Sequence, residues 1–317
     1  METVPENSLS SRPLAIKIVE ILVVFLINVL SLGGNVLVCV TVYSKKNLRT
    51  ITNMFIIAVC VADILLASVA MPLTLGSLIM DYWPFGDLTC QIQGFCIHLL
   101  VFQSLHIITL TAMNRNLNVV RPWLYKRIFT KWKTLFLILT VIILTAVVMG
   151  VLVVSLSSRY VFHPGKAICV MTFPNIDASL RFTVAFGILF VVFPAIIISA
   201  CYARVLQTIR SHRREYDAAR GKYDSRSILS RKEMKLSKLV SVIILGFSLC
   251  WIPCVIIDII DTTRKQWFSR QLYIFYTCLA YTSAVLNPWI YGFMNKLVRK
   301  EMIFLSTSLC RFAKRRT

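Results

Sequence analysis

The sequence predicts an all-α membrane protein, a seven-transmembrane helix bundle with a short amphipathic C-terminal helix. Hydrophobic residues make up 57% of the 317-residue chain and charged residues only 15%, the reverse of what a soluble surface requires. The apolar residues gather in seven continuous stretches, and a hydrocarbon core about 30 Å thick needs roughly 20 helical residues to cross it. Because these stretches are continuous rather than alternating, helices are favoured over the strands of a barrel.

In chain order, the expected helices cover residues 14–43, 50–79, 88–118, 133–157, 179–207, 236–260 and 269–292. A terminus (1–13) and a tail (293–317) flank them, so residues 1–317 are expected to form a single transmembrane domain. The first stretch is too long for the apolar core of a signal peptide and lacks a small-residue cleavage site. It is therefore expected to remain as helix one.

Basic residues indicate which end of the bundle faces the cytoplasm. The net charge is +21, and 26 of the 35 lysines and arginines lie in 44–49, 121–133, 204–238 and the tail after Tyr291. Short loops rich in lysine and arginine stay cytoplasmic. The N-terminus is thus expected outside and the C-terminus inside. Topology and attraction to anionic membrane lipids then explain the charge, and no nucleic-acid partner is expected.

Two of the ten cysteines are expected at the outer, oxidising face of the bundle. Cys90 starts the third stretch, and Cys169 lies in the second outer loop. Disulfides form in such compartments, so this pair is expected to be bonded.

Polar residues inside the spans carry most of the functional signal, because burying them is costly unless they are paired or hydrated. Asp63 lies in the middle of the second stretch, with Ser104, Ser283 and Asn287 at similar depth. These oxygens could hold a sodium ion together with water. Alternatively, they form a hydrated hydrogen-bond network around a protonated Asp63.

Residues at the ends of the expected helices, and prolines within them, suggest that the helices move relative to one another. Arg115 lies at the inner end of the third stretch, where Glu233 could pair with it as a breakable latch; simple snorkelling to the interface is the alternative. Proline kinks a helix, and the prolines singled out within the spans are Pro194, Pro253 and Pro288. An aromatic pair, Phe247 and Trp251, shares one face of the sixth stretch just before Pro253, and Tyr291 follows Asn287-Pro288.

Along almost its whole length the chain resembles a rhodopsin-like (class A) G-protein-coupled receptor. The matching motifs, at matching mutual spacing, are Gly34-Asn35, Ala62-Asp63, Trp83-x-Phe85-Gly86, Cys90, Arg115 with Pro122, Cys169, Pro194 with Tyr202, Phe247-x-x-Cys250-Trp251-x-Pro253 and Asn287-Pro288-x-x-Tyr291. The resemblance implies an outer ligand pocket, a sodium centre at Asp63 and an inner cavity for a heterotrimeric G protein. It also implies that Arg115 and Tyr202 line this cavity and that Trp123 contacts the G protein from the second inner loop.

The chain departs from the family pattern at several positions. Asparagines, Asn114 and Asn116, flank Arg115 in place of the usual acid and tyrosine, which removes a local restraint and would allow raised basal activity. Ser283 replaces a frequent asparagine and weakens the sodium interpretation. Ile97 stands where aminergic receptors place an aspartate, and the seventh stretch contains no lysine to anchor retinal. A biogenic amine and retinal are therefore not expected as ligands.

Several fragments are similar to melatonin receptors. They are Cys90-Gln91-x-x-Gly94-Phe95, Asn114-Arg115, Cys201-Tyr202-x-Arg204, Tyr291-Gly292, Arg299-Lys300-Glu301 and Ser308-Leu309-Cys310. Melatonin receptors usually have Asn-Ala rather than Asn-Pro in helix seven, and their pocket asparagine and histidine are replaced here by Leu152 and Phe190. The chain resembles a relative of that group with its own ligand preference.

Helical spacing places a mostly apolar, aromatic set near the outer side of the bundle, the composition of a small-molecule site. The candidate pocket comprises Ile97, His98, Val101, Phe102, Phe186, Phe190, Trp251, Asp258, Thr277 and Tyr281. We expect a small, largely apolar or aromatic ligand that is neutral or weakly basic. The alternative is that the aromatic rings only pack on one another and His98 only satisfies a backbone carbonyl.

Two further expectations concern the tail and the protein class. Segment 295–306 could lie on the inner leaflet as an amphipathic helix, and Cys310 beside basic residues is a palmitoylation candidate, with a reduced thiol as the alternative. A transporter or channel is the alternative class, although neither repeat symmetry nor broken helices is evident. The four histidines form no metal cluster and no catalytic motif is present, so no enzyme activity and no cofactor besides sodium are expected.

Overall fold

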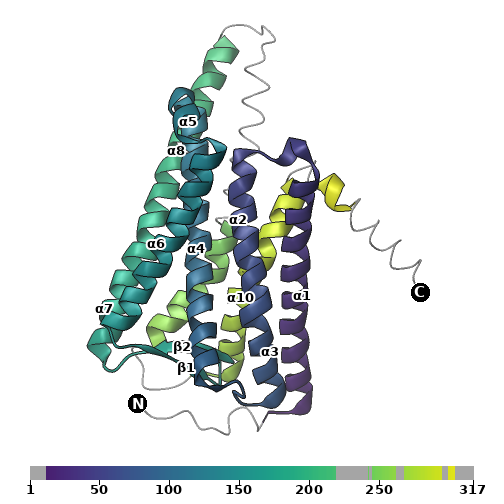
Figure 1. The fold of residues 1–317 in the computed structure, drawn as a ribbon, viewed down its shortest axis with the longest axis vertical. Coiled ribbons are helices and arrows are strands. Elements are labelled where there is room, and N and C mark those ends of the chain that lie inside the picture. The colour runs from purple at the N-terminus through teal and green to yellow at the C-terminus, as the bar shows by residue number, and fades with distance from the viewer. Residues whose placement is uncertain (1–11, 219–241, 243–244, 262–267, 295–298, 304–317) are drawn as a thin grey trace, which may run out of the picture.

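The fold is a bundle of long helices with a β-hairpin across one end (Figure 1). In the computed structural model, the described residues are 12–218, 242, 245–261, 268–294 and 299–303. Below, the end that carries the hairpin and the Cys90–Cys169 disulfide is called the disulfide end, and the opposite end the Arg115 end.

The helices follow one another in the expected order. The first is α1 (Leu14–Ser44), followed by a short 3-10 turn, η2 (Lys46–Leu48). The second consists of α2 (Ile51–Leu65), the π segment η3 (Leu66–Ala70) and α3 (Met71–Met80). The third is α4 (Gly86–Val120), and the short α5 (Pro122–Ile128) leads to the fourth, α6 (Lys131–Ser155).

Strands β1 (Arg159–His163) and β2 (Ile168–Thr172) form the antiparallel hairpin between the fourth and fifth helices, with Phe162 paired to Cys169. The fifth helix consists of α7 (Ile176–Phe186), the π segment η4 (Gly187–Val192) and α8 (Phe193–Ala218). The sixth is described over 245–261, the seventh is α10 (Arg270–Met294), and a helical stretch follows at 299–303. Within the described ranges, the expected seven-helix bundle is confirmed.

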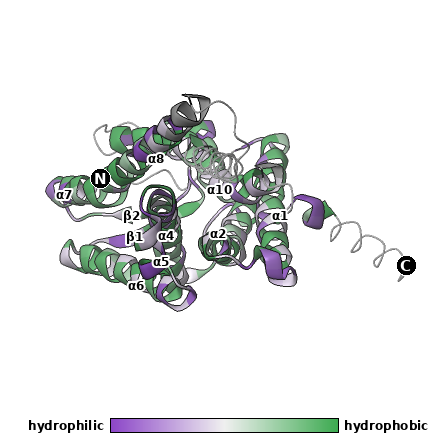
Figure 2. Cartoon of the chain, turned by 90° about the horizontal axis from the view of Figure 1, so that it is seen from above, coloured by the Kyte–Doolittle hydropathy of each residue, from purple (hydrophilic) through white to green (hydrophobic). Residues whose placement is uncertain are grey.

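Apolar side chains cover the outside of the bundle, as a membrane protein requires. Five of the described helices are long and apolar enough to span a bilayer. On α6, for example, Phe136, Ile143 and Val151 are 73%, 62% and 59% exposed. Figure 2 shows hydrophobic residues around the helices, where lipid would replace water as the neighbour.

Helix α4 occupies the centre of the bundle. It contacts α2, α6, α8 and both strands, while α1 packs along α10. One apolar cluster fills the Arg115 end and includes Phe55, Ile107, Tyr202 and Tyr291. Other clusters fill the disulfide end around Trp251. Helices from the beginning, the middle and the end of the chain therefore pack against one another within the bundle.

Prolines lie within four of the described long helices, at Pro72, Pro194, Pro253 and Pro288, and Pro72 was not singled out from the sequence. Pro72 and Pro194 are each the second residue after the end of a π segment, η3 and η4 respectively. A proline leaves the carbonyl four residues earlier without its helical donor. For these two prolines that carbonyl belongs to Ser68 or Phe190, inside the π segment, where hydrogen bonds shift to i→i+5 spacing.

Pro288, inside α10, is accommodated by a neighbouring helix. Pro288 leaves the carbonyl of Ala284 without its helical donor. Asn35 of α1 donates its Nδ2–H to this oxygen at 3.0 Å. Asn35 also donates to Ser31 O at 2.8 Å. A Cβ on Gly34 would lie 2.8 Å from Pro288 Cγ, so only glycine lets α1 approach this closely. The Gly34-Asn35 motif thus accommodates Pro288 within α10.

We predict that Asn35→Ala destabilises the protein by ~1–3 kcal/mol, because the buried Ala284 carbonyl loses its donor. Asn28→Ala is the matched control, since Asn28 is a buried asparagine two turns earlier on α1 that makes no described hydrogen bond. The measurement is the apparent Tm of each purified variant in detergent. Equal losses in both variants would show that the Asn35–Ala284 bond is unimportant.

Candidate functional site

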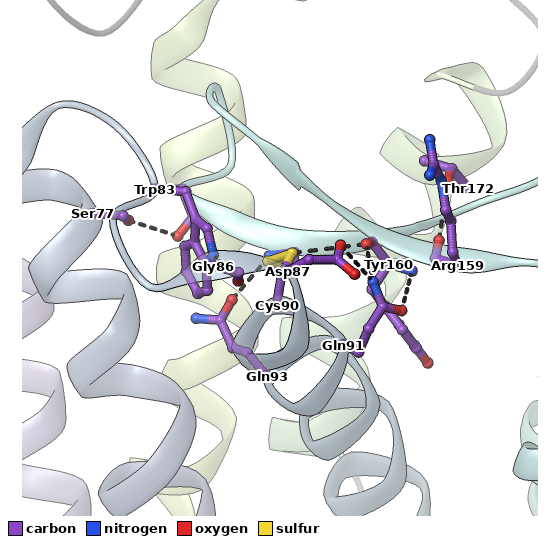
Figure 3. Close-up of a disulfide and its surroundings, with 12 residues drawn as sticks. Ser77, Trp83, Gly86, Asp87, Cys90, Gln91, Gln93, Arg159, Tyr160 and Thr172 are labelled. Atoms are coloured by element: carbon purple, nitrogen blue, oxygen red, sulfur yellow. Dashed lines mark hydrogen bonds between the residues drawn. A yellow bond between two sulfur atoms is a disulfide. The ribbon is translucent and has the colours of Figure 1, made fainter.

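The β-hairpin is pinned onto the start of α4 by a disulfide and two glutamines (Figure 3). The Cys90–Cys169 bond predicted from the sequence is confirmed. Gln91 Oε1 accepts from Tyr160 N at 2.9 Å, and its Nε2 donates to Tyr160 O at 2.7 Å. The fully buried Gln93 accepts from Cys169 N at 3.0 Å and donates to Ala70 O at 3.1 Å. Both strands are therefore held in register against α4.

The approach of strand β1 to α4 depends on a glycine. A Cβ on Gly94 would lie 2.1 Å from Tyr160 Cδ1. Tyr160 is 2% exposed, and its ring centroid lies 5.5 Å from that of His98. The hairpin thus reaches the edge of the aromatic candidate pocket. Sequence reasoning did not single out Tyr160, because nothing local indicates where a loop residue will pack.

The tip of the hairpin enters the bundle between the sixth helix and α10. Lys166 is 4% exposed, and its Nζ lies 2.9 Å from Asp258 Oδ1 and 3.1 Å from Asp261 Oδ2. Burial opposes the charged form of Lys166, but the two carboxylates outweigh it and raise its pKa above the ordinary value. Thr277 Oγ1 donates to Lys166 O at 2.6 Å, which fixes the backbone of the tip.

His163 stabilises the same tip as a neutral imidazole. Burial and the nearby charge of Lys166 lower the pKa of His163 to about 3. Its Nδ1 accepts a hydrogen bond from Lys166 N at 3.1 Å, which requires an unprotonated nitrogen. Its ring lies 4.7 Å from that of Tyr273, centroid to centroid. His163 therefore adds no positive charge beside Lys166 at neutral pH.

A second ionic network closes the disulfide end near α1. Arg12 pairs with the buried Glu20 and with Asp81 at 2.6 Å, and Lys17 pairs with Asp81 at 2.5 Å. Burial raises the pKa of Asp81, but Lys17 and Arg12 outweigh it and lower the pKa below its ordinary value. Arg270 of α10 pairs with Glu20 at 3.0 Å. This network joins α1, α3 and α10.

The aromatic part of the predicted pocket is brought together as one cluster. Phe102 of α4 lies 4.3 Å from Phe186 and 5.3 Å from Phe190 of the fifth helix, and 6.4 Å from Trp251 of the sixth, between ring centroids. Val101 belongs to the same cluster, and Ile97 to the adjoining one, which also contacts Trp251. The Nε1–H of Trp251 is buried and has no hydrogen-bond partner in the described part of the chain.

The polar members of the predicted pocket are engaged elsewhere. Asp258 pairs with Lys166, Thr277 with the backbone of Lys166, and Tyr281 Oη with Thr74 Oγ1 at 2.8 Å. His98 Nδ1 bonds its own helix at Gly94 O, at 2.9 Å, as the packing alternative anticipated. Three of the four polar candidates therefore hold the hairpin and the helices together rather than line the aromatic cluster.

Asp63 meets one of its three expected partners. Asn287 Nδ2 donates to Asp63 Oδ2 at 2.8 Å, which joins the second and seventh helices. Ser283 Oγ donates to Ala280 O at 2.7 Å, and Ser104 is buried. Among the described residues, no group of three or more His, Cys, Asp or Glu side chains could hold a metal ion. Asp63 is the one carboxylate at this depth of the described bundle.

At the Arg115 end, the asparagines beside Arg115 connect three helices. Thr52 Oγ1 of α2 donates to Asn114 Oδ1 at 3.4 Å, and Asn116 Nδ2 donates to Cys201 O of α8 at 3.1 Å. Arg115 itself is 5% exposed. Asn114 and Asn116, which depart from the family pattern, thus each connect α4 to another helix by a hydrogen bond.

The remaining candidates lie close to these helix ends. Tyr202 and Tyr291 share the apolar cluster at the Arg115 end, and Phe247, stacked on Trp251 at 5.9 Å, contacts both this cluster and the aromatic one. Trp123 is 67% exposed on α5. Pro253 lies within the sixth helix. Glu233 and Cys310 fall outside the described residues, as does much of segment 295–306, of which 299–303 is helical.

We predict that Cys90→Ser and Cys169→Ser each sharply reduce the amount of protein at the cell surface. Losing such a bridge typically costs ~2–5 kcal/mol, and here the hairpin register depends on it. Cys96→Ser, which removes a free cysteine on the same helix, is the control. Surface labelling of an epitope-tagged chain gives the measurement. Normal surface levels of both bridge variants would contradict the structural role of the disulfide.

Comparison with known proteins agrees with the seven-helix fold described above. A sequence model of the family described as "7 transmembrane receptor (rhodopsin family)" matches residues 34–291. The melatonin receptor type 1A of Mus musculus is 29% identical over 286 residues, which cover 89% of this chain and 78% of that protein. The allatostatin-A receptor of Bombyx mori is 28% identical over 279 residues, covering 86% and 75%.

Among solved structures, squid rhodopsin has a similar fold. The TM-score is 0.79 with 22% sequence identity, and the match covers 95% of this chain and 86% of that one. At this level of identity the likeness concerns the fold alone.

Proposed function

Because the chain belongs to the rhodopsin family of seven-transmembrane receptors, which signal through G proteins and are not enzymes, we propose a ligand class for it. The ligand is a small, mostly apolar or aromatic molecule, neutral or weakly basic, that binds among Phe102, Phe186, Phe190 and Trp251. A neutral aromatic such as melatonin belongs to this class. Membership of this receptor family also argues against the transporter or channel alternative.

The aromatic cluster is the observation that carries this proposal. Rings from three different helices lie within stacking distance of one another, and small-molecule sites are lined mainly by hydrophobic and aromatic side chains. The buried, unpartnered Nε1–H of Trp251 would donate a hydrogen bond to an oxygen atom of the ligand. We therefore propose that the ligand carries at least one hydrogen-bond acceptor.

The apolar character of the cluster distinguishes this receptor from those it resembles. Leu152 and Phe190, which replace the pocket asparagine and histidine expected of melatonin receptors, both belong to the cluster. Two polar anchors are thus exchanged for apolar contacts. Recognition would rest on shape and stacking more than on hydrogen bonds, and the preferred ligand would be less polar than melatonin.

A peptide ligand, suggested by the allatostatin-A receptor among the relatives, fits the geometry less well. The hairpin tip is buried between the helices, with Lys166 4% and Ala167 0% exposed. A peptide would have to displace this tip and its ion pairs. A small molecule that inserts among the aromatic rings would leave the tip and its ion pairs in place.

Sidedness, sodium binding and lipidation belong to the same proposal. The disulfide end would face outward and the Arg115 end the cytoplasm, supported by the oxidised cysteines and by the basic residues near Arg115. Asp63 and Ser104 are the residues that would supply oxygen ligands to a sodium ion, with water completing its shell. Cys310 would be palmitoylated, supported by its position beside basic residues in the tail.

Signalling would proceed by a shift in population between two arrangements of the bundle. A ligand shifts such an equilibrium only by its difference in affinity between the two states. Trp251 contacts the aromatic cluster, and Phe247, stacked on it, reaches the cluster that contains Tyr202 and Tyr291. Helix six would carry the change from the ligand to the G-protein side.

The proposal is tested with cells that express the receptor and a panel of chimeric G proteins. Melatonin and less polar aromatic analogues should activate it, whereas allatostatin-A peptides and charged amines should not. Phe190→Ala should then raise the Kd of the active ligand by roughly tenfold or more, and more than Asp258→Ala does. Activation by a peptide or charged amine that depends chiefly on Asp258 would overturn the ligand class.

Arg115→Ala should abolish G-protein activation while leaving the ligand Kd within about threefold of the parent value, because Arg115 lies far from the aromatic cluster. Arg121→Ala, which removes an exposed arginine at the same end, is the control. Glu233→Ala should raise basal signalling if Glu233 restrains Arg115 in the closed state. Unchanged basal signalling in Glu233→Ala would favour simple snorkelling of Arg115.

A further inference from the structure

Two carboxylates and two tyrosine rings surround the ammonium group of Lys166. Asp258 and Asp261 come from the sixth helix, and Tyr273 and Tyr276 from α10. Besides its two ion pairs, Lys166 Nζ lies 4.6 Å from the ring centroid of Tyr276 and 5.5 Å from that of Tyr273. Carboxylates combined with aromatic faces are the groups that bind organic ammonium ions.

The helices build this arrangement independently of the lysine. Tyr276 Oη donates to Asp258 Oδ2 at 3.0 Å, and Tyr273 Oη donates to Asp261 Oδ1 at 2.5 Å. Each carboxylate on the sixth helix is thus oriented by a hydroxyl from the seventh. Because these hydrogen bonds do not involve Lys166, we expect the site to keep its shape when Lys166 is removed.

The site also has an opening to solvent. The Lys166 side chain is 5% exposed, whereas that of Asp258 is 48% exposed. The carboxylate of Asp258 is therefore the part of this site that a small ammonium ion can approach from outside the bundle. Lys166 reaches them from the hairpin, where its backbone is held by Thr277 and His163.

We propose that Asp258, Asp261, Tyr273 and Tyr276 form a binding site for a primary ammonium group, which the receptor fills with its own Lys166. The hairpin tip is then a tethered ligand that joins the sixth and seventh helices at the disulfide end. Tethering gives Lys166 a high effective concentration, so external amines bind only when Lys166 is removed. This site is separate from the aromatic cluster, and its test uses neither the receptor's ligand nor a G protein.

The test is chemical rescue of Lys166→Ala in the purified full-length receptor. The variant lacks three methylenes and an ammonium group, which n-propylammonium supplies in protonated form at pH 7. Loss of one partner from a buried ion pair should lower the apparent Tm by about 5 °C or more. Millimolar n-propylammonium should restore at least half of this loss, while n-propanol, which has similar size and no charge, should not.

Three controls define the site. Arg159→Ala removes an exposed cation from the same hairpin and should leave the apparent Tm unchanged. The parent receptor should not respond to n-propylammonium, because Lys166 occupies the site. The triple variant Lys166→Ala/Asp258→Asn/Asp261→Asn should not be rescued, because the carboxylates are gone.

A second measurement keeps the proposal testable if Lys166→Ala does not fold. Brief reductive methylation of the parent receptor should modify the exposed Lys131 and spare Lys166, and Asp258→Asn/Asp261→Asn should make Lys166 reactive. The proposal is overturned if n-propylammonium fails to rescue, if n-propanol or the triple variant gives the same rescue, or if Lys166 is methylated as fast as Lys131 in the parent.

Discussion

Backbone hydrogen bonding in a medium without water is the constraint on which the rest of this structure depends. An unsatisfied peptide group in the bilayer costs several kcal/mol, so every departure from a straight helix must supply a replacement partner. At Pro288 the partner is Asn35 of α1, which donates to the Ala284 carbonyl. At Pro72 and Pro194 the affected carbonyls fall inside π segments. The bends expected of a signalling protein are thus built into the helices at specific positions.

The same constraint explains why polar side chains join helices that are distant in sequence. Asn287 and Asp63 connect the seventh helix to the second, while Asn114 and Asn116 connect the third to the second and fifth. In a family member with an acid and a tyrosine beside the arginine, these connections would differ. The sequence indicated that a restraint on Arg115 was lost, and the structure adds that both asparagines acquire partners on other helices.

Periodicity and motif spacing were sufficient to predict the helices, the disulfide and the aromatic cluster. These features depend on local hydrophobicity, on sidedness or on residues a few helical turns apart. The roles of Asp258, Thr277 and Tyr281 were not predictable in the same way. Their partners, Lys166 and Thr74, lie far away in the chain, and a loop sequence does not show how deeply its tip enters the bundle. One signal was available: Lys166 is three residues from Cys169, which the disulfide places over α4.

The buried glutamate of α1 has a consequence for how the chain enters the membrane. Glu20 lies on α1, yet its partner Arg270 is 250 residues further along the chain. Arg12, only eight residues away, also contacts Glu20. Because Arg12 emerges from the ribosome before Glu20, the acid has a compensating charge from the moment it is made. The charge of Glu20 can therefore be compensated from within its own segment before Arg270 of the seventh helix is synthesised.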